Sequence, residues 1–252
     1  MKIKTLLILA GILVLNSCVS TYYQMYKAVP TEDLTIKDDA LIFENDDCRV
    51  SYNLWSSGGN IGFVMYNKSN ENIHVILDES FFILNGFANN YFQNRVFTKS
   101  NTLSISTSTI IDKSSLGTSV SYNEEKDICI PPHASKIISE YSITKELYRD
   151  CDLLKYPTTN QAKSLKFTKD NSPFVFSNFI TYTMGQANII EIIKNDFYVN
   201  EITNYPENMV LDKKLEKFCG QEGTIMIDYF KMVSPDKFYF KYINDGFGTL
   251  KH

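Results

Sequence analysis

Short runs of alternating apolar and polar residues fill most of the chain beyond residue 47. In the first of them, "RVSYNLW", Val50, Tyr52 and Leu54 share one face, which is the pattern of a strand with one buried side. Strands at a spacing of roughly ten residues, with at most short helices, predict an all-β, antiparallel β-sandwich. Further β-branched and aromatic runs, each bounded by turn residues, cover residues 61–67, 72–78, 80–92, 134–143, 172–185 and 188–202.

The connections between these runs predict which strands pair. The Asn85-Gly86 dipeptide favours a type I′ turn, so residues 80–92 should form one hairpin. The polar loop "KSNEN" has hairpin length, and "SPD" places its proline suitably for a turn. We therefore expect two more pairs, including a C-terminal β-hairpin, between residues 61–67 and 72–78 and between residues 224–233 and 237–243.

Two segments have helical signals instead. In "VLDKKLEKFCG" the leucines and Phe218 fall on one face, and Gly220 can end a helix. In "TKELYRD", Thr144 is a suitable N-cap. We predict short helices at residues 210–220 and 144–150.

The N-terminus has the features of a bacterial lipoprotein signal. Two lysines precede an apolar run, residues 6–15, that is too short to span a bilayer. In the following "LNSC", small Ser17 and Cys18 look like a lipobox, in which the cysteine thiol receives a diacylglycerol before cleavage. We predict a signal peptide at residues 1–17 and a lipidated Cys18. The alternatives are an ordinary cleaved signal with a coincidental cysteine and an uncleaved membrane helix.

The remaining chain divides by composition. Residues 18–47 have the polar character of a tether, and residues 48–252 form the predicted sandwich domain. Between Ser100 and Ser121, 12 of 22 residues are serine or threonine, which marks an insertion near residues 98–127. A flexible surface insertion fits best because apolar anchors are sparse there. A pair of edge strands and a glycan-bearing stalk are the alternatives.

The charge distribution argues against a nucleic-acid partner. The formal net charge is −4, and no basic run occurs. Phosphate binding requires clustered lysine and arginine, so we predict no nucleic acid.

Four cysteines follow Cys18. In an exported chain an even number is compatible with two disulfides. Their wide spacing excludes a CxxC redox pair and a zinc knuckle. Free buried thiols also fit the sequence, but we favour disulfides among Cys48, Cys129, Cys151 and Cys219.

The sequence lacks the common catalytic and metal motifs, among them G-x-S-x-G, HExxH, a phosphate loop and EF-hand spacing. We therefore predict no catalytic residue, no metal site and no cofactor. His74 lies in a strand-like run, His133 follows two prolines, and His252 is the last residue. Acidic residues between Asp38 and Asp47 could gather a calcium ion, but a solvated linker is the simpler interpretation.

The segment "GFANNYFQNR" is the main candidate for binding. Amides and aromatic rings are common in sugar or peptide recognition, because rings stack on apolar faces while amides give paired hydrogen bonds. In the alternative interpretation the aromatic residues belong to the core and the amides cap strand ends. Trp55 is likewise either a core residue or a platform for a ligand. The candidate binding residues are Asn89, Asn90, Tyr91, Asn94 and Arg95.

Three stretches of the chain resemble a known protein group. The stretch from Tyr52 to Arg95, "SPFVFSNFITYT" and "NDFYVNEITNYP" are similar to parts of uncharacterised envelope lipoproteins of Bacteroidetes-type bacteria. The resemblance covers much of residues 48–206 and implies an envelope lipoprotein with an immunoglobulin-like β-sandwich. It brings no known catalytic or binding residues. Surface-exported lipoproteins of that group tend to have an acidic cluster after the cysteine, and "VSTYYQMYKA" has none, which favours the periplasmic side of the outer membrane over the cell surface.

Together these features predict a membrane-anchored, non-catalytic binding or assembly module. Its expected partners are the membrane, through the lipid anchor, and an envelope protein or a glycan. The alternative is a cell-wall or glycan hydrolase with an unrecognised acidic pair, because glycosidases need two carboxylates about 5 to 9.5 Å apart. A purely structural subunit of a lipoprotein assembly, exposing a large apolar patch, is a third candidate.

Overall fold

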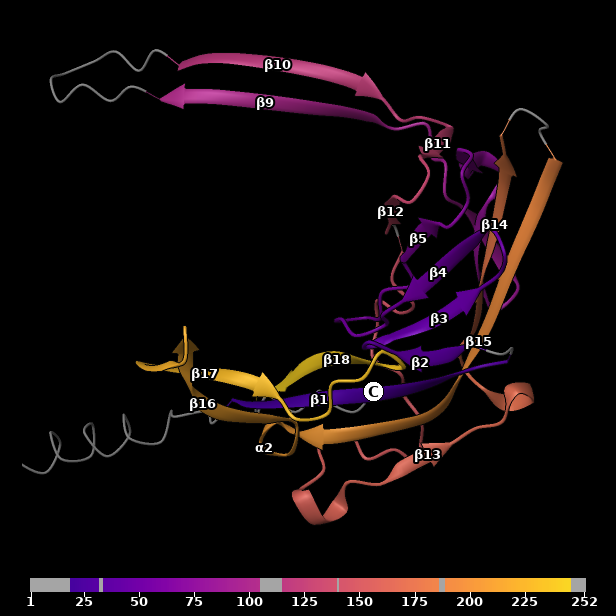
Figure 1. Cartoon of the computed structure of the whole chain (residues 1–252). Helices are drawn as coiled ribbons and strands as arrows, with labels where there is room; N and C mark the ends of the chain where they lie inside the picture. The colour runs from indigo at the N-terminus through magenta and orange to yellow at the C-terminus, as the bar shows by residue number, and fades with distance from the viewer. Residues whose placement is uncertain (1–18, 32–33, 105–114, 140, 186–188, 246–252) are drawn as a thin grey trace, which may run out of the picture.

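The structure is a computed structural model that describes residues 19–245, apart from residues 32–33, 105–114, 140 and 186–188. Two antiparallel sheets pack against each other, and two hairpins project from them (Figure 1). The all-β sandwich predicted from the alternation of apolar residues is confirmed.

The larger sheet has nine strands. They are β1 (Ser20–Pro30), β6 (Ile73–Ile76), β7 (Phe81–Leu84), β8 (Phe87–Asn90), β11 (Asp127–Ile130), β13 (Ser164–Lys166), β14 (Val175–Met184), β15 (Ile189–Pro206) and β18 (Lys237–Asn244). Six follow the order β11-β6-β14-β15-β1-β18, while β13 pairs with β15 and β7 joins β14 to β8. Because β15 pairs first with β14 and then with β1, it links the two halves of the sheet.

The second sheet has five strands in the order β12-β5-β4-β3-β2. They are β2 (Thr35–Lys37), β3 (Ala40–Glu44), β4 (Cys48–Tyr52), β5 (Phe63–Asn67) and β12 (Ser135–Ile138). Tyr52 connects the two sheets, since its hydroxyl donates to Asn195 Oδ1 at 2.7 Å and its ring meets that of Phe197 on β15 at 5.4 Å. The predicted buried face is confirmed, because Val50, Tyr52 and Leu54 are all fully buried.

The two projecting hairpins are β9 (Val96–Ser104) with β10 (Ser115–Asn123), and β16 (Leu211–Phe218) with β17 (Gln221–Phe230). Both extend toward the same side of the sandwich in Figure 1. The described parts of the Ser/Thr-rich segment therefore form a pair of strands, which was one of the alternatives, and not the flexible surface insertion that we favoured. Residues 105–114 lie outside the described part of the chain.

Neither predicted helix forms. Leu211 and Leu215 are four residues apart, a spacing that also places both side chains on one face of a strand, and the segment pairs with β17 as β16. Around residue 144, the Thr144 hydroxyl accepts a hydrogen bond from the Glu146 N–H at 3.2 Å and closes a turn instead of capping a helix. The described helical segments are α2 (Glu207–Val210) and three single 3-10 turns, η1 (Leu77–Glu79), η2 (Thr159–Gln161) and η3 (Lys169–Asn171).

The predicted tether is wrong for residues 20–30, which form β1 between β15 and β18. Tyr26 is fully buried and its ring stacks on Phe238 at 4.6 Å. Gln24 is also fully buried, and its Nε2 donates to Asn204 Oδ1 at 2.9 Å. Residues 23–26 are all buried, so both faces of β1 are covered here, and the sequence of such a strand need not alternate. The later part of the predicted tether supplies β2 and β3.

Only one of the three predicted hairpins is correct. Asn85 (φ 49°) and Gly86 (φ 84°) form the tight turn between β7 and β8, as a type I′ turn requires. In contrast, β5 pairs with β4 and β12 while β6 pairs with β11 and β14, so the "KSNEN" loop crosses between the sheets. β17 pairs with β16 and β18 with β1, which makes β16–β17 the C-terminal hairpin.

The four cysteines of the described chain are free thiols, so the predicted disulfides are wrong. Cys48 is buried on β4 of the second sheet, whereas Cys129 lies half-buried on β11 at the edge of the larger sheet. Cys151 and Cys219 are exposed, the latter at the β16–β17 turn. Burial, with a smaller contribution from Asp47, raises the pKa of the Cys48 thiol to about 12 and keeps it neutral.

Candidate functional site

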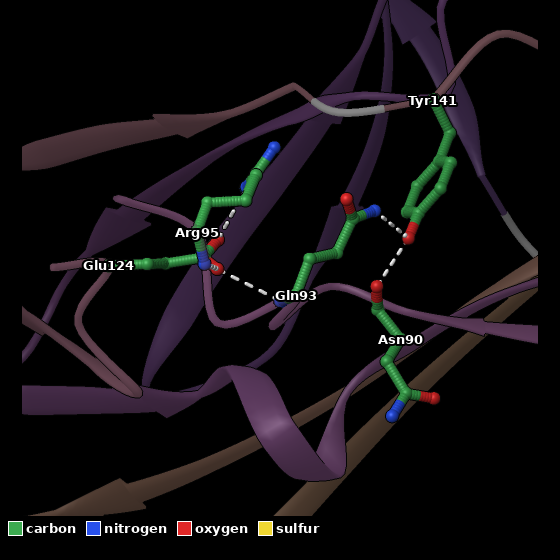
Figure 2. Close-up of polar contacts among 5 residues, drawn as sticks. All are labelled: Asn90, Gln93, Arg95, Glu124 and Tyr141. Carbon is green, nitrogen blue, oxygen red and sulfur yellow. Dashed lines mark hydrogen bonds and ion pairs between the residues drawn. The ribbon is translucent and has the colours of Figure 1, made fainter. Parts of the chain in front are cut away.

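The structure separates the five candidate binding residues into different roles. Tyr91 is 1% exposed, and its hydroxyl donates to Asn178 Oδ1 at 2.6 Å, so it belongs to the core as the alternative interpretation held. Asn89 and Asn90 are exposed at the end of β8, and Asn94 takes a left-handed conformation (φ 53°) in the turn that follows. Arg95 faces Glu124 (Figure 2). The five residues do not form one ligand-binding surface.

Arg95 and Glu124 form a charged pair at the base of the β9–β10 hairpin (Figure 2). The Glu124 side chain is only 6% exposed; one carboxylate oxygen accepts from the Gln93 N–H at 2.9 Å and the Arg95 N–H at 3.1 Å. Burial alone would raise the pKa of this carboxyl, but the Arg95 side chain and the two N–H groups outweigh it and hold the pKa below its usual value. The pair therefore fixes the direction in which the hairpin leaves the sandwich.

A pocket of about 560 Å³ lies between the β7–β8 hairpin and the irregular segment that follows β12. This volume is within the usual range for small-ligand sites. Of the predicted binding residues, only Asn89 lines it. The pocket is lined by Phe82, Leu84, Asn89, residues 141–149 and Phe174.

Tyr141 holds one wall of this pocket in place. Its ring stacks on Phe82 at 5.3 Å and meets the edge of Tyr91 at 5.5 Å. Its hydroxyl donates to the Asn90 carbonyl and accepts from Gln93 Nε2 at 2.7 Å (Figure 2). The wall is thus built by the core and does not depend on a ligand.

The charged side chains of the pocket were not identified from the sequence. Lys145, Glu146 and Arg149 are exposed at its rim, and in the part of the chain that the structure describes none of the three forms an ion pair. Residues 141–149 span the end of a predicted strand and a predicted helix, so the sequence did not indicate that they form an irregular wall. The two cations and one carboxylate leave the rim with one net positive charge beside the aromatic rings of the lining. Such a pocket suits an amphipathic molecule with an acidic group.

The histidines and Trp55 have local roles. His74 lies on β6 opposite Cys129 and Thr183, and a ring nitrogen of His133 lies 3.1 Å from Asn70 Oδ1. Trp55 packs edge-on against Phe230 at 5.1 Å in a small apolar cluster. Among the described residues, no group of three or more His, Cys, Asp or Glu side chains is placed to hold a metal ion.

A second pocket, of about 370 Å³, brings carboxylates together where α2 meets the β16–β17 hairpin. Lys213 Nζ lies 4.0 Å from Asp228 Oδ1, and the Tyr229 hydroxyl donates to Asp212 Oδ2 at 3.3 Å. Asp212 and Asp228 are exposed. The pocket is lined by Glu207, Asn208, Leu211, Asp212, Lys213, Asp228 and Lys231.

The β9–β10 hairpin exposes apolar side chains. Phe97, Tyr122 and Val120 share one face, and they are 37%, 53% and 66% exposed. Lys99, the sole charged residue of the two strands, pairs with Val120 on the same face, and the Arg95 guanidinium lies 5.3 Å from the centre of the Phe97 ring. β9 and β10 pair only with each other among the described strands, so the outer edge of each presents unpaired backbone groups.

No protein-family model, curated protein or solved structure matches this chain. The resemblance to envelope lipoproteins, and the immunoglobulin-like topology that it implies, therefore stay predictions. No helix of the described residues has the length and apolarity needed to cross a membrane. Cys18, the signal peptide and His252 lie outside the described part of the chain.

Proposed function

We propose that this chain is a membrane-anchored, non-catalytic envelope lipoprotein whose β9–β10 hairpin binds another envelope protein. Cys18 supplies the lipid anchor, and the sandwich positions the hairpin on the periplasmic side of the outer membrane. The exposed apolar face of the hairpin, Phe97, Val120 and Tyr122, is the observation that supports a partner. A two-stranded hairpin standing alone is at best marginally stable in water, and soluble proteins seldom leave such apolar faces uncovered.

The hairpin favours a protein partner over a membrane or a nucleic acid. Its cations are Lys99 and, over the Phe97 ring, the Arg95 guanidinium, which is paired with Glu124, so the hairpin lacks the clustered cationic side chains that anionic lipids or phosphates require. Its two free edges can accept an additional strand through backbone hydrogen bonds, while the apolar face packs against the partner's side chains. Attachment to the membrane raises the effective concentration of the hairpin near such a partner.

Site-directed photo-crosslinking in intact cells tests this proposal. A photoreactive amino acid at Val120, which is 66% exposed, should give a discrete adduct of higher mass. The same amino acid at Ile36 on β2, 60% exposed, serves as the matched control and should give none. The proposal is wrong if Val120 gives no adduct or if both positions give the same adducts. Replacing Cys18 with alanine should release the protein from the membrane fraction and weaken the Val120 adduct.

The carboxylates of the second pocket are the observation that bears on the hydrolase alternative. A general acid has to stay protonated near neutral pH, which requires burial among apolar groups or a close negative charge. Asp212 and Asp228 are exposed instead, and Lys213 lies beside Asp228. The arrangement therefore favours the non-catalytic function.

A further inference from the structure

We propose that the end of the molecule at which β1 begins rests on the membrane and inserts tyrosine and aliphatic side chains into its interface. This inference rests on the proposed lipidation of Cys18. Cys18 directly precedes Val19, and β1 begins at Ser20. Since consecutive Cα atoms are about 3.8 Å apart, the first residue of β1 lies within about 8 Å of the anchored residue. The anchor therefore holds this end of the sheet at the bilayer surface.

Three tyrosines gather at that end. The ring of Tyr22 lies 5.6 Å from Tyr242, its neighbour on β18, and 5.2 Å from Tyr156. The Tyr242 hydroxyl donates to the Lys155 carbonyl, which fixes the loop that contains Tyr156 against the strand. All three side chains are partly exposed. Tyrosine, with an apolar ring and a polar tip, is enriched where a membrane meets water.

Exposed aliphatic side chains lie at the same end of the sheet as this tyrosine cluster (Tyr22, Tyr156 and Tyr242), although Ile243 is on the opposite face from Tyr242 because successive side chains of a strand alternate. Val19, Leu154 and Ile243 are 58%, 53% and 54% exposed. Ile243 is at the end of β18, paired with Thr21, and the Leu154 carbonyl accepts from Asn204 on the neighbouring end of β15 at 3.0 Å. Exposure of these apolar side chains to water is unfavourable, and their transfer from water to the boundary of the acyl chains lowers the free energy.

Two further features of the same end suit a lipid surface. Lys155 is exposed with its ammonium group over the Tyr156 ring, and Lys241 is exposed on the opposite face of β18, over the Tyr23 ring. Both ammonium groups can reach anionic headgroups at this end. The β16–β17 hairpin also lies at this end (Figure 1), and its Ile225 and Met226 are 61% and 56% exposed. The β9–β10 hairpin leaves the other end of the sandwich and extends toward the same side as the β16–β17 hairpin (Figure 1).

The test uses the purified, lipidated full chain, reconstituted into vesicles of zwitterionic and anionic phospholipid with or without brominated acyl chains. Bromine quenches tryptophan emission at short range, so an Ile243→Trp variant should lose much of its added emission in brominated vesicles. The matched control is Ile137→Trp on β12, where the side chain is 74% exposed in the other sheet, and it should not be quenched. Native Trp55 supplies the background that is subtracted from both. If Ile243→Trp does not fold, Leu154→Trp probes the same surface.

The outcomes separate the docking surface from the anchor. Quenching at residue 243 or 154 but not at 137 supports the inference. Protein that floats with the vesicles but is not quenched at these positions, or is quenched equally at residue 137, is anchored without docking through this end, and the inference is then wrong. Protein that does not float with the vesicles is not anchored, in which case the proposed lipidation and the docking surface are both wrong.

Discussion

At the scale of single residues, Arg95 shows why a side chain that looks suited to ligand binding can be structural. Its guanidinium faces Glu124, a carboxylate brought close by the return of the β9–β10 hairpin from 29 residues away. The sequence shows Arg95 beside amides and aromatic rings but does not show which acidic residue it meets. The buried carboxylate depends on the guanidinium and two N–H donors, because an unpaired charge at this depth is costly.

Replacing Glu124 with glutamine should lower the free energy of unfolding at neutral pH by about 1.5–3 kcal/mol, the range for hydrogen bonds to charged groups. The pKa of Glu124 is lowered in the folded protein, so its stabilisation is present above the ordinary glutamate pKa of about 4.3 and is lost as pH falls through the lower, folded value. The difference in free energy of unfolding between the native protein and the variant should therefore shrink as the pH is lowered from about 5 toward the pH at which the protein unfolds. Urea unfolding at several pH values measures it.

The matched control is Glu44→Gln. Glu44 is paired with Lys68 at 2.9 Å, and the hydrogen bond and charge of Lys68 lower its pKa as well, but both side chains are solvated. Exposed pairs contribute little, so this variant should unfold like the native protein at neutral pH. Equal effects from the two variants would mean that the Glu124 pair is no more important than a surface pair.

At the scale of elements, Gly59 fixes the loop between β4 and β5. It has φ +77°, and a Cβ there would lie 2.8 Å from Ile143 Cδ1 and 2.9 Å from the Phe238 ring. Its backbone carbonyl accepts from the Ile143 N–H at 3.0 Å. The loop can approach β18 and the segment that follows β12 this closely only because residue 59 has no side chain.

We expect Gly59→Ala to lower the free energy of unfolding by about 2–5 kcal/mol, the sum of a left-handed backbone penalty and overpacking. Gly86→Ala is the matched control: it has φ +84° but no atom within 4 Å of a Cβ, so it should cost only about 1–2 kcal/mol. Denaturant unfolding of both variants measures the difference. Equal losses would show that the close approach at residue 59 does not matter.

The elements that could be predicted are those determined by neighbouring residues. The Asn85-Gly86 turn and the buried face of β4 follow from local chemistry and periodicity, and both are correct. Strand pairing depends on contacts between distant segments, which is why the "KSNEN" loop was assigned to a hairpin although it crosses between sheets. The leucines of β16 fit a helix and a strand equally well, and only its pairing with β17 decides. The pocket of residues 141–149 was missed for the same reason, since its walls come from four separate segments.

At the scale of the whole molecule, β1 determines how the domain relates to its proposed anchor. The sequence suggested a tether of some thirty residues, which would allow the domain to move far from the membrane. Instead β1 begins two residues after Cys18 and lies between β15 and β18 in the larger sheet. The position of the anchor relative to the sandwich is then set by the sheet and not by a loose linker.

This placement makes β1 indispensable to the fold. A chain that starts at Val19 keeps every described strand, whereas a chain that starts at Thr31 lacks β1 and leaves β15 and β18 without the strand between them. It also loses buried side chains such as Tyr23 and Tyr26, each contributing about 1.5–3 kcal/mol, against a typical total stability of about 5–15 kcal/mol. We expect the chain from Val19 to unfold cooperatively on heating and the chain from Thr31 to show no cooperative transition, as followed by circular dichroism. Cooperative unfolding of the shorter chain would restore the tether interpretation and, with it, a domain free to move away from the membrane.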